Sequence, residues 1–141
     1  MFKNFFKKKE KENSNEKNIL IIALLIHAAK IDENYTEAEK KIIKMAIMQL
    51  NQIHENEAEK LLKIAEKKEE ESNQIVEFTK EIKKQPMEFR LKIIEIIWKI
   101  VYSDSTKDNF ESNLIRRICG LLYVSDKDNG LIKTKVQNLI K

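Results

Sequence analysis

Carboxylates at a regular spacing are the residues of this chain whose types and positions suit chemistry. Asp32 is followed seven positions later by Glu39, and the same pair of residue types recurs 72 positions further along. Carboxylate oxygens in loops are ligands that hard cations such as Ca²⁺ or Mg²⁺ prefer. If the two halves of the chain pair by pseudo-two-fold symmetry, the carboxylates would converge on one divalent metal ion. The candidate metal ligands are therefore Asp32, Glu39, Asp104 and Glu111.

The two glutamates also have a structural explanation. Thr36 and Asp108 each precede one of them by three positions, which is the spacing of a capping box. In that motif the first residue caps a helix, and the glutamate side chain returns to the backbone N–H of the cap. Such a cap stabilises a helix by about 1 kcal/mol. Capping leaves the two aspartates unexplained, although aspartate often hydrogen-bonds loop amides in turns. Metal binding and helix capping are compatible, and the sequence leaves both open.

A further acidic segment, residues 126–130, begins like the calcium-binding loop of an EF-hand. Its glycine comes one position early, and the twelfth position holds Gln137 where an EF-hand has glutamate. The spacing of Ser125 and Asp128 instead suits another helix cap. We therefore expect no EF-hand site in this segment.

The other residues of chemical interest lie apart from one another. His27 falls in an apolar segment and His54 near a helix start, with no cysteine nearby to complete the three or four ligands of a zinc site. Cys119 lies in an apolar run, where a free cysteine usually packs as a small core residue. No phosphate-binding glycine loop, dinucleotide fingerprint or nucleophile elbow occurs. The sequence predicts that the protein is not an enzyme.

The composition indicates that helices position these residues. The chain has only 2 glycines and 1 proline among 141 residues, and 35% of its residues are charged. A β protein needs more turn residues than this, whereas helices carry many charges on their outer faces. The single cysteine excludes an internal disulfide and favours a reducing compartment. We expect an all-α fold, a single-domain bundle of about seven helices.

Apolar periodicity places these helices and shows a repeat. The first and fifth are apolar on nearly all sides, which is typical of helices in the middle of a bundle. Each is followed by an acidic loop and an amphipathic helix, and both copies follow the pattern D-x-x-x-[TD]-x-x-E. We interpret this as an internal duplication of about 25 residues per copy, giving two helix–acidic loop–helix units. The expected helices lie near 18–30, 37–50, 55–69, 73–84, from Pro86 onward, 109–122 and 126–140.

These features together resemble the TerB family of tellurite-resistance proteins. The signature of that family is an apolar helix ending in an alanine-rich turn, then roughly A-D-G-x-[IL]-x-x-x-E, and it occurs twice. Residues 29–39 and 102–111 are similar to it here. Trp98 and residues 121–126 also fit, the latter against the family pattern L-L-G-[LV]-S-D. The resemblance covers about residues 18–140.

The chain departs from the family pattern within the loops. Glu33 and Ser105 stand where the family has glycine, and Lys107 is not apolar, so the backbone of each turn is less free. The resemblance implies an all-helical bundle of two related halves. It also implies a part in a stress-response or membrane-linked system and metal binding by the acidic loops, with no established reaction.

The positive charge of the chain lies mainly at its start. The net charge is +4, of which residues 1–17 contribute +3 and the remainder +1. We expect residues 1–17 to form a disordered or weakly helical basic tail and residues 18–141 to form the TerB-like domain. Residues 1–9 combine three phenylalanines with four lysines, a mixture that suits peripheral contact with an anionic membrane. A solvated tail is the alternative, and the nearly neutral remainder disfavours nucleic acid as a partner.

The apolar run at residues 19–29 bears on localisation. It resembles the core of a signal peptide, but three glutamates precede it, and it is shorter than the roughly 20 residues that span a bilayer. We expect a cytoplasmic protein, at the inner face of the membrane where its tail meets lipid.

Two functions are consistent with these residues. The first is a non-enzymatic binding or adaptor module of a tellurite-resistance-like stress response, with a protein partner and a divalent cation, Ca²⁺ or Mg²⁺, held by the paired acidic loops. The alternative is a purely structural protein–protein interaction domain, peripherally associated with the membrane and without metal. The sequence leaves the oligomeric state open.

Overall fold

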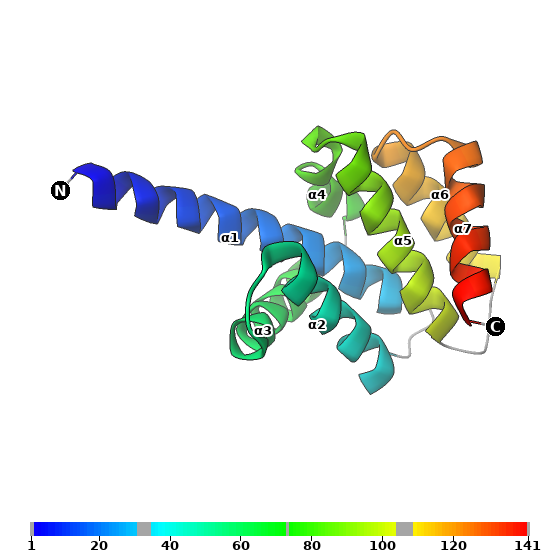
Figure 1. Ribbon diagram of the computed structural model, residues 1–141, viewed down its shortest axis with the longest axis horizontal. Helices are drawn as coiled ribbons and strands as arrows, with labels where there is room; N and C mark the ends of the chain where they lie inside the picture. The colour runs from blue at the N-terminus through cyan, green and yellow to red at the C-terminus, as the bar shows by residue number, and fades with distance from the viewer. Residues whose placement is uncertain (1, 31–34, 73, 104–108, 141) are drawn as a thin grey trace.

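Seven α-helices and one short 3₁₀ helix make up the described part of the chain, and no strand occurs in it (Figure 1). The computed structural model describes the backbone of residues 2–30, 35–72, 74–103 and 109–140; it describes side chains from residue 16 onward in these ranges, except for 109–112 and 140. The all-α fold predicted from the sequence is confirmed. The helices are α1 (Phe2–Ala29), α2 (Glu37–Asn51), α3 (Glu55–Glu71), α4 (Ile75–Thr79), η2 (Ile82–Lys84), α5 (Met87–Ser103), α6 (Asn109–Leu121) and α7 (Asp126–Ile140).

The first helix is longer than the periodicity predicted. We expected it to start near residue 18, after a disordered or weakly helical tail, whereas helical backbone begins at Phe2. Apolar periodicity could not show this, because the sequence of the added part has no regular apolar pattern. It contains neither glycine nor proline, and lysine and glutamate have high helix propensity. The division of the chain into a tail and a domain stays a prediction.

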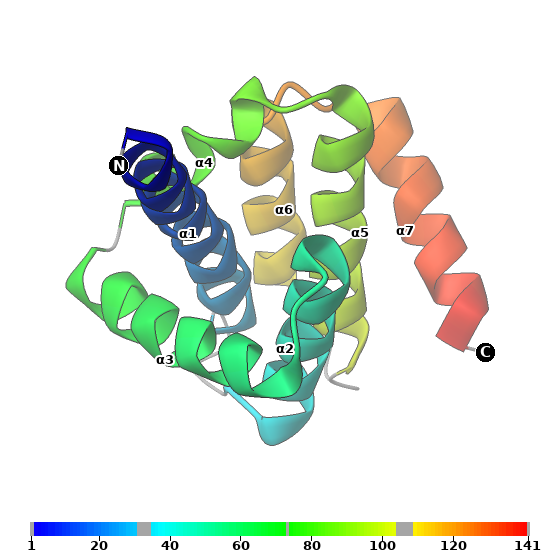
Figure 2. The same ribbon diagram turned by 60° about the vertical axis from the view of Figure 1, so that its left-hand side comes forward.

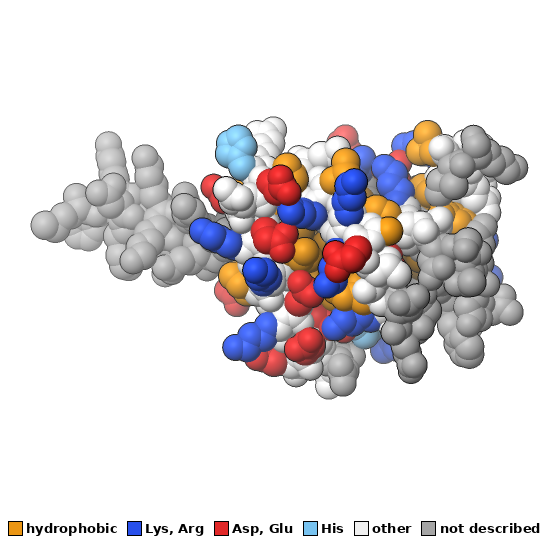
Figure 3. Space-filling view, turned by 90° about the horizontal axis from the view of Figure 1, so that it is seen from below, with side chains coloured by type: hydrophobic (Ala, Val, Ile, Leu, Met, Phe, Trp, Pro, Cys, Tyr) orange, Lys and Arg blue, Asp and Glu red, His pale blue; other side chains and the backbone are white. Residues whose placement is uncertain are grey.

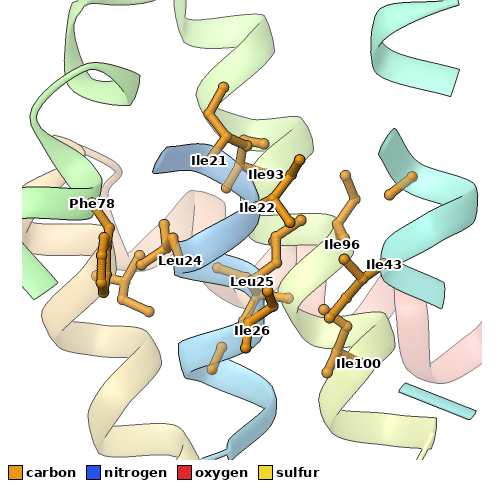
Figure 4. Close-up of a cluster of buried hydrophobic side chains, with 14 of the residues drawn as sticks. Ile21, Ile22, Leu24, Leu25, Ile26, Ile43, Phe78, Ile93, Ile96 and Ile100 are labelled. Carbon is orange, nitrogen blue, oxygen red and sulfur yellow. The ribbon is translucent and has the colours of Figure 1, made fainter. Parts of the chain in front are cut away.

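Helices α1 and α5 form the centre of the bundle. The apolar segment of α1 is buried on every side, and α2, α3, α4, α5 and α6 all pack against this helix. Helices α1 and α5 run in the same direction. Ile21 and Ile22 lie beside Ile93 near the start of both segments, and Ile26 and Ile100 lie together near their ends (Figure 4). Figures 1 and 2 also show α1 and α5 running in the same direction.

The remaining long helices surround this pair in a way that repeats. Helix α3 packs on α1 as α7 packs on α5, and α6 packs on α1 as α2 packs on α5. Helix α6 begins 72 positions after α2, and α7 begins 71 positions after α3. The duplication thus includes three helices in each half, which is more than the 25 residues recognised in the sequence. Figure 2 shows α3 and α7 on the two outer flanks.

The turn between α6 and α7 holds a strained residue. Tyr123 has φ 57°, in the left-handed region that favours glycine, and the family pattern has glycine at this position. The backbone N–H of Val124 donates to the Cys119 carbonyl at 2.9 Å, and that of Tyr123 donates to the Gly120 carbonyl at 3.3 Å. These two bonds form a Schellman motif, which ends the helix with its carbonyls satisfied. The ring of Tyr123 contributes little, because the residue is 67% exposed.

We predict that Tyr123→Gly stabilises the fold by about 0.5–1 kcal/mol, because glycine adopts this conformation without the penalty of a Cβ. Chemical denaturation with urea would measure the free energy of unfolding. Tyr123→Ala is the matched control, since it removes the same ring but keeps the Cβ. Equal stability of the glycine and alanine variants would show that the backbone conformation costs nothing.

Candidate functional site at the acidic-loop end

The four predicted metal ligands differ in how much the structure describes of them. Asp32 and Asp104 lie in residues 31–34 and 104–108, outside the described residues. Glu111 lies on α6, and its side chain is also outside the described residues. Glu39 is fully described and is only 3% exposed. The predicted metal site therefore stays a prediction, and Glu39 is the member whose surroundings can be examined.

Glu39 completes a capping box at the start of α2. Its backbone N–H donates to Thr36 Oγ1 at 3.1 Å, and its Oε1 accepts from the Thr36 backbone N–H at 2.9 Å. The capping interpretation of the first copy is thereby confirmed. One carboxylate oxygen of Glu39 is engaged by the backbone, which limits how this residue can serve an ion.

A buried carboxylate that we did not single out in the sequence lies beside the first loop. Glu69 of α3 accepts from Lys30 Nζ at 2.8 Å and lies 3.3 Å from His27 Nδ1. The ring of His27 also packs against Phe78 at a centroid distance of 6.0 Å. His27 thus has the packing role expected for it, with a carboxylate partner in addition. The buried apolar stripe of α3 gave no signal for Glu69, because the sequence does not show which glutamate of a charged helix faces inward.

Tyr35, which follows the first loop directly in the sequence, lies among carboxylates of α2 and α3. Its hydroxyl is buried and has no hydrogen-bond partner among the described residues. Burial raises the pKa of Tyr35, and nearby carboxylates raise it further even though Lys30 and Lys40 lie over the ring at 5.7 and 4.9 Å. The carboxylates, in order of effect, are Glu66, Glu37, Glu39 and Glu69.

The lysines next to this loop already pair with carboxylates. Lys30 pairs with Glu69, while Lys40 lies 3.6 Å from Glu37 Oε1 and 4.0 Å from Glu66 Oε2. On the face that carries α2 and α3, acidic and basic side chains alternate and form no patch of one sign (Figure 3). The positive charges of Lys30 and Lys40 are therefore balanced by carboxylates of the bundle itself.

The C-terminal ends of α1 and α5 lie at the same end of the bundle, because the two helices run in the same direction, and each is followed in the sequence by one acidic loop. Lys30 is the last described residue before the first loop, and Ser103 is the last before the second. The described residues alone hold no group of three or more His, Cys, Asp or Glu side chains that could bind a metal ion. An ion at this end would thus require the loop aspartates themselves.

The family model described as Tellurite resistance protein TerB matches residues 18–134, which include both acidic loops and most of the helical bundle. The chain belongs to the TerB family. No curated protein and no solved structure gives a significant match. The family assignment and the helical fold agree with the resemblance found in the sequence motifs.

The other residues considered for chemistry have structural positions in this TerB domain. Ser125 Oγ accepts from the Asp128 backbone N–H at 3.1 Å, which confirms the cap predicted at the start of α7. His54 is exposed and precedes α3 without a side-chain capping bond. Cys119 is buried, as predicted, and burial raises the pKa of its thiol to about 12, with Asp126 adding to the effect. No helix in the described ranges is long and apolar enough to cross a membrane.

We predict that Thr36→Ala lowers the free energy of unfolding by about 1 kcal/mol, because the N–H groups of the first turn of α2 lose their cap. Thr36→Ser keeps the hydroxyl and should retain most of the stability. Thermal and urea unfolding of the three proteins would compare them. An alanine variant as stable as the native protein would mean that the capping box contributes nothing.

We also predict that Cys119 is unreactive in the folded protein. With a thiol pKa of about 12, only about one molecule in ten thousand carries the thiolate at pH 8. A colorimetric disulfide reagent should react slowly in buffer and rapidly in urea. Ser103→Cys supplies an exposed thiol as a matched positive control. Fast reaction of Cys119 in the folded state would contradict its place in the core.

Proposed function

We propose that this TerB-family protein is a non-enzymatic binding module of a tellurite-resistance-type stress response, and that its acidic-loop end takes up a divalent cation, Ca²⁺ or Mg²⁺. The observation that carries the proposal is the common direction of α1 and α5. Because of it, the loop containing Asp32 and the loop containing Asp104 begin at the same end of the bundle. Two loops at opposite ends could not share an ion.

The electrostatics of this end favour a cation. Four carboxylates lie near enough to the Tyr35 hydroxyl to raise its pKa, although two lysines also lie nearby. Lys30 and Lys40 already pair with other carboxylates, and residues 31–34 and 104–108 contain four acidic residues against one lysine, so the loops would bring an excess of negative charge. A divalent ion would supply that compensation, and Asp32, Asp104, Glu39 and Glu111 are the residues that we propose to hold it.

A role without catalysis is supported by the structural use of the titratable groups. Glu39 caps a helix, Glu69 pairs with Lys30 and His27, and Cys119 has a raised thiol pKa. Each group is committed to holding the fold together. None of the three is placed as a nucleophile or a general base needs to be.

A protein-interaction domain without metal is the second candidate. The completed capping box favours it, because the box accounts for Glu39 without an ion. In this version the N-terminal part of α1, which projects from the bundle in Figure 1, would reach a partner or a membrane surface at the cytoplasmic side.

Calorimetric titration with Ca²⁺ and with Mg²⁺ separates the two candidates. We expect binding heat for the native protein and its loss in the double variant Asp32→Asn/Asp104→Asn. Asp126→Asn/Asp128→Asn is the matched control: it removes the same charge from the other acidic segment and should still bind. Absence of heat in the native protein, or undiminished heat in the loop variant, would exclude the proposed cation site and leave the second candidate.

A further inference from the structure

A surface groove lies between α2 and α7, with α5 as its floor. Its volume is about 550 Å³, and it shares no lining residue with the polar cluster of Tyr35, Glu39 and Glu69. Ala46, Ile96 and Val136 line it with apolar surface, and Met45 and Leu139, which are 52% and 65% exposed, stand along it. Figures 1 and 2 both show α5 between α2 and α7. An apolar groove between helices is the kind of surface into which an amphipathic helix can pack.

The internal repeat shows which kind of segment packs on the equivalent surface of the first half. The corresponding surface of the first half lies on α1 beside α6, and α4, which follows α3, packs there with η2 against it. Ile75, Phe78 and Ile82 of this segment are at most 2% exposed. Phe78 points toward Leu24 of α1, and Leu24 is 72 positions before Ile96 of the groove (Figure 4).

The charges of the groove differ from those of its covered counterpart. Lys92 and Lys99 line the groove, whereas residues 72 positions earlier are Leu20 and His27. Lys92 lies 3.2 Å from Glu95, but Lys99 has no ion pair with any described residue. None of the described residues that line the groove is acidic. An occupant with carboxylates beside its apolar face would be complementary, while a lysine-rich segment such as residues 1–9 would be repelled.

We propose that the groove between α2 and α7 docks a short amphipathic helix of a protein partner, with apolar residues at positions i, i+3 and i+7 and acidic residues beside them. The apolar spacing is that of Ile75, Phe78 and Ile82, the buried residues of the segment that forms α4 and η2 in the first half. The positive charges of Lys99 and Lys92 favour a partner helix that carries acidic residues beside its apolar face. The docking needs no metal ion, so it goes beyond the proposed cation binding and stands independently of it.

The test uses the full chain and a synthetic peptide of roughly 15 residues, since shorter isolated helices are marginal in water. The peptide carries the i, i+3, i+7 apolar pattern with glutamates on its flank, and a second peptide has lysines in their place. Fluorescence anisotropy is measured in the presence of EDTA. We expect the glutamate peptide to bind with a Kd below about 1 mM and the lysine peptide to bind more weakly by roughly tenfold or more.

Variants at exposed positions locate the binding. Met45→Glu should abolish it, whereas Ile64→Glu places the same charge at an equally exposed site on α3, 51% against 52%, and should leave binding unchanged. Lys99→Glu should weaken the glutamate peptide roughly tenfold and strengthen the lysine peptide, a charge swap that a general loss of structure would not produce. Circular dichroism would confirm that each variant is folded.

Three outcomes would overturn the inference. One is the absence of binding by the glutamate peptide up to about 1 mM. Another is binding that Met45→Glu and Lys99→Glu leave unchanged, since the peptide would then occupy a different surface. The third is self-association of the native protein, seen by sedimentation and abolished by Met45→Glu, because the groove would then be filled by a second copy of this chain.

Discussion

The burial of α1 is the constraint on which the rest of the structure depends. Its segment from Leu20 to Ala29 is apolar on all sides except at His27, and the apolar side chains are at most 5% exposed. Full burial of a leucine or isoleucine contributes about 1.5–3 kcal/mol, so a helix of this kind is stable only when other helices enclose it. Helix α5 has the same character, and the two lie side by side in the centre of the molecule. The common direction of these two helices brings the acidic loops to one end.

The two halves bury their central helices in the same way, with one difference. In each half a central helix is covered by an outer helix, α3 or α7, and by an amphipathic helix from the other half. In the first half, α4 also packs on the central helix α1. The equivalent surface on α5 carries a groove with Lys92 and Lys99 along it. The two equivalent surfaces thus differ in their side chains and in what packs on them among the described residues.

The sequence predicted the helices well where burial decides the conformation. The starts of α2, α3, α6 and α7 agree within one residue with the predicted segments, since caps and apolar stripes mark them. It left the N-terminal extension of α1 open between a disordered and a weakly helical tail, because these lysine- and glutamate-rich residues show no apolar periodicity. It also missed the roles of Glu69 and Tyr35. Their surroundings come from helices that are distant in the sequence, and one glutamate among many gives no local signal.

The candidate sites were predictable to different degrees. The capping box of Thr36 and Glu39 follows from a local spacing and is confirmed. The groove could not be foreseen, because it arises from the relative positions of three helices. The convergence of the loop aspartates stays a prediction, but it now has a geometric basis in the direction of α1 and α5.

The most direct test of the common direction of α1 and α5 is a pair of distances measured between spin labels in a Cys119→Ala background. Labels at Glu37 and Ser103, both exposed, mark the positions just after the first loop and just before the second. Labels at Glu37 and Met87 use the opposite end of α5, which is about 25 Å long at 1.5 Å per residue. We expect the distance from Glu37 to Ser103 to be clearly the shorter of the two. If the distance from Glu37 to Met87 were shorter, α1 and α5 would run in opposite directions, and the two acidic loops could not share an ion.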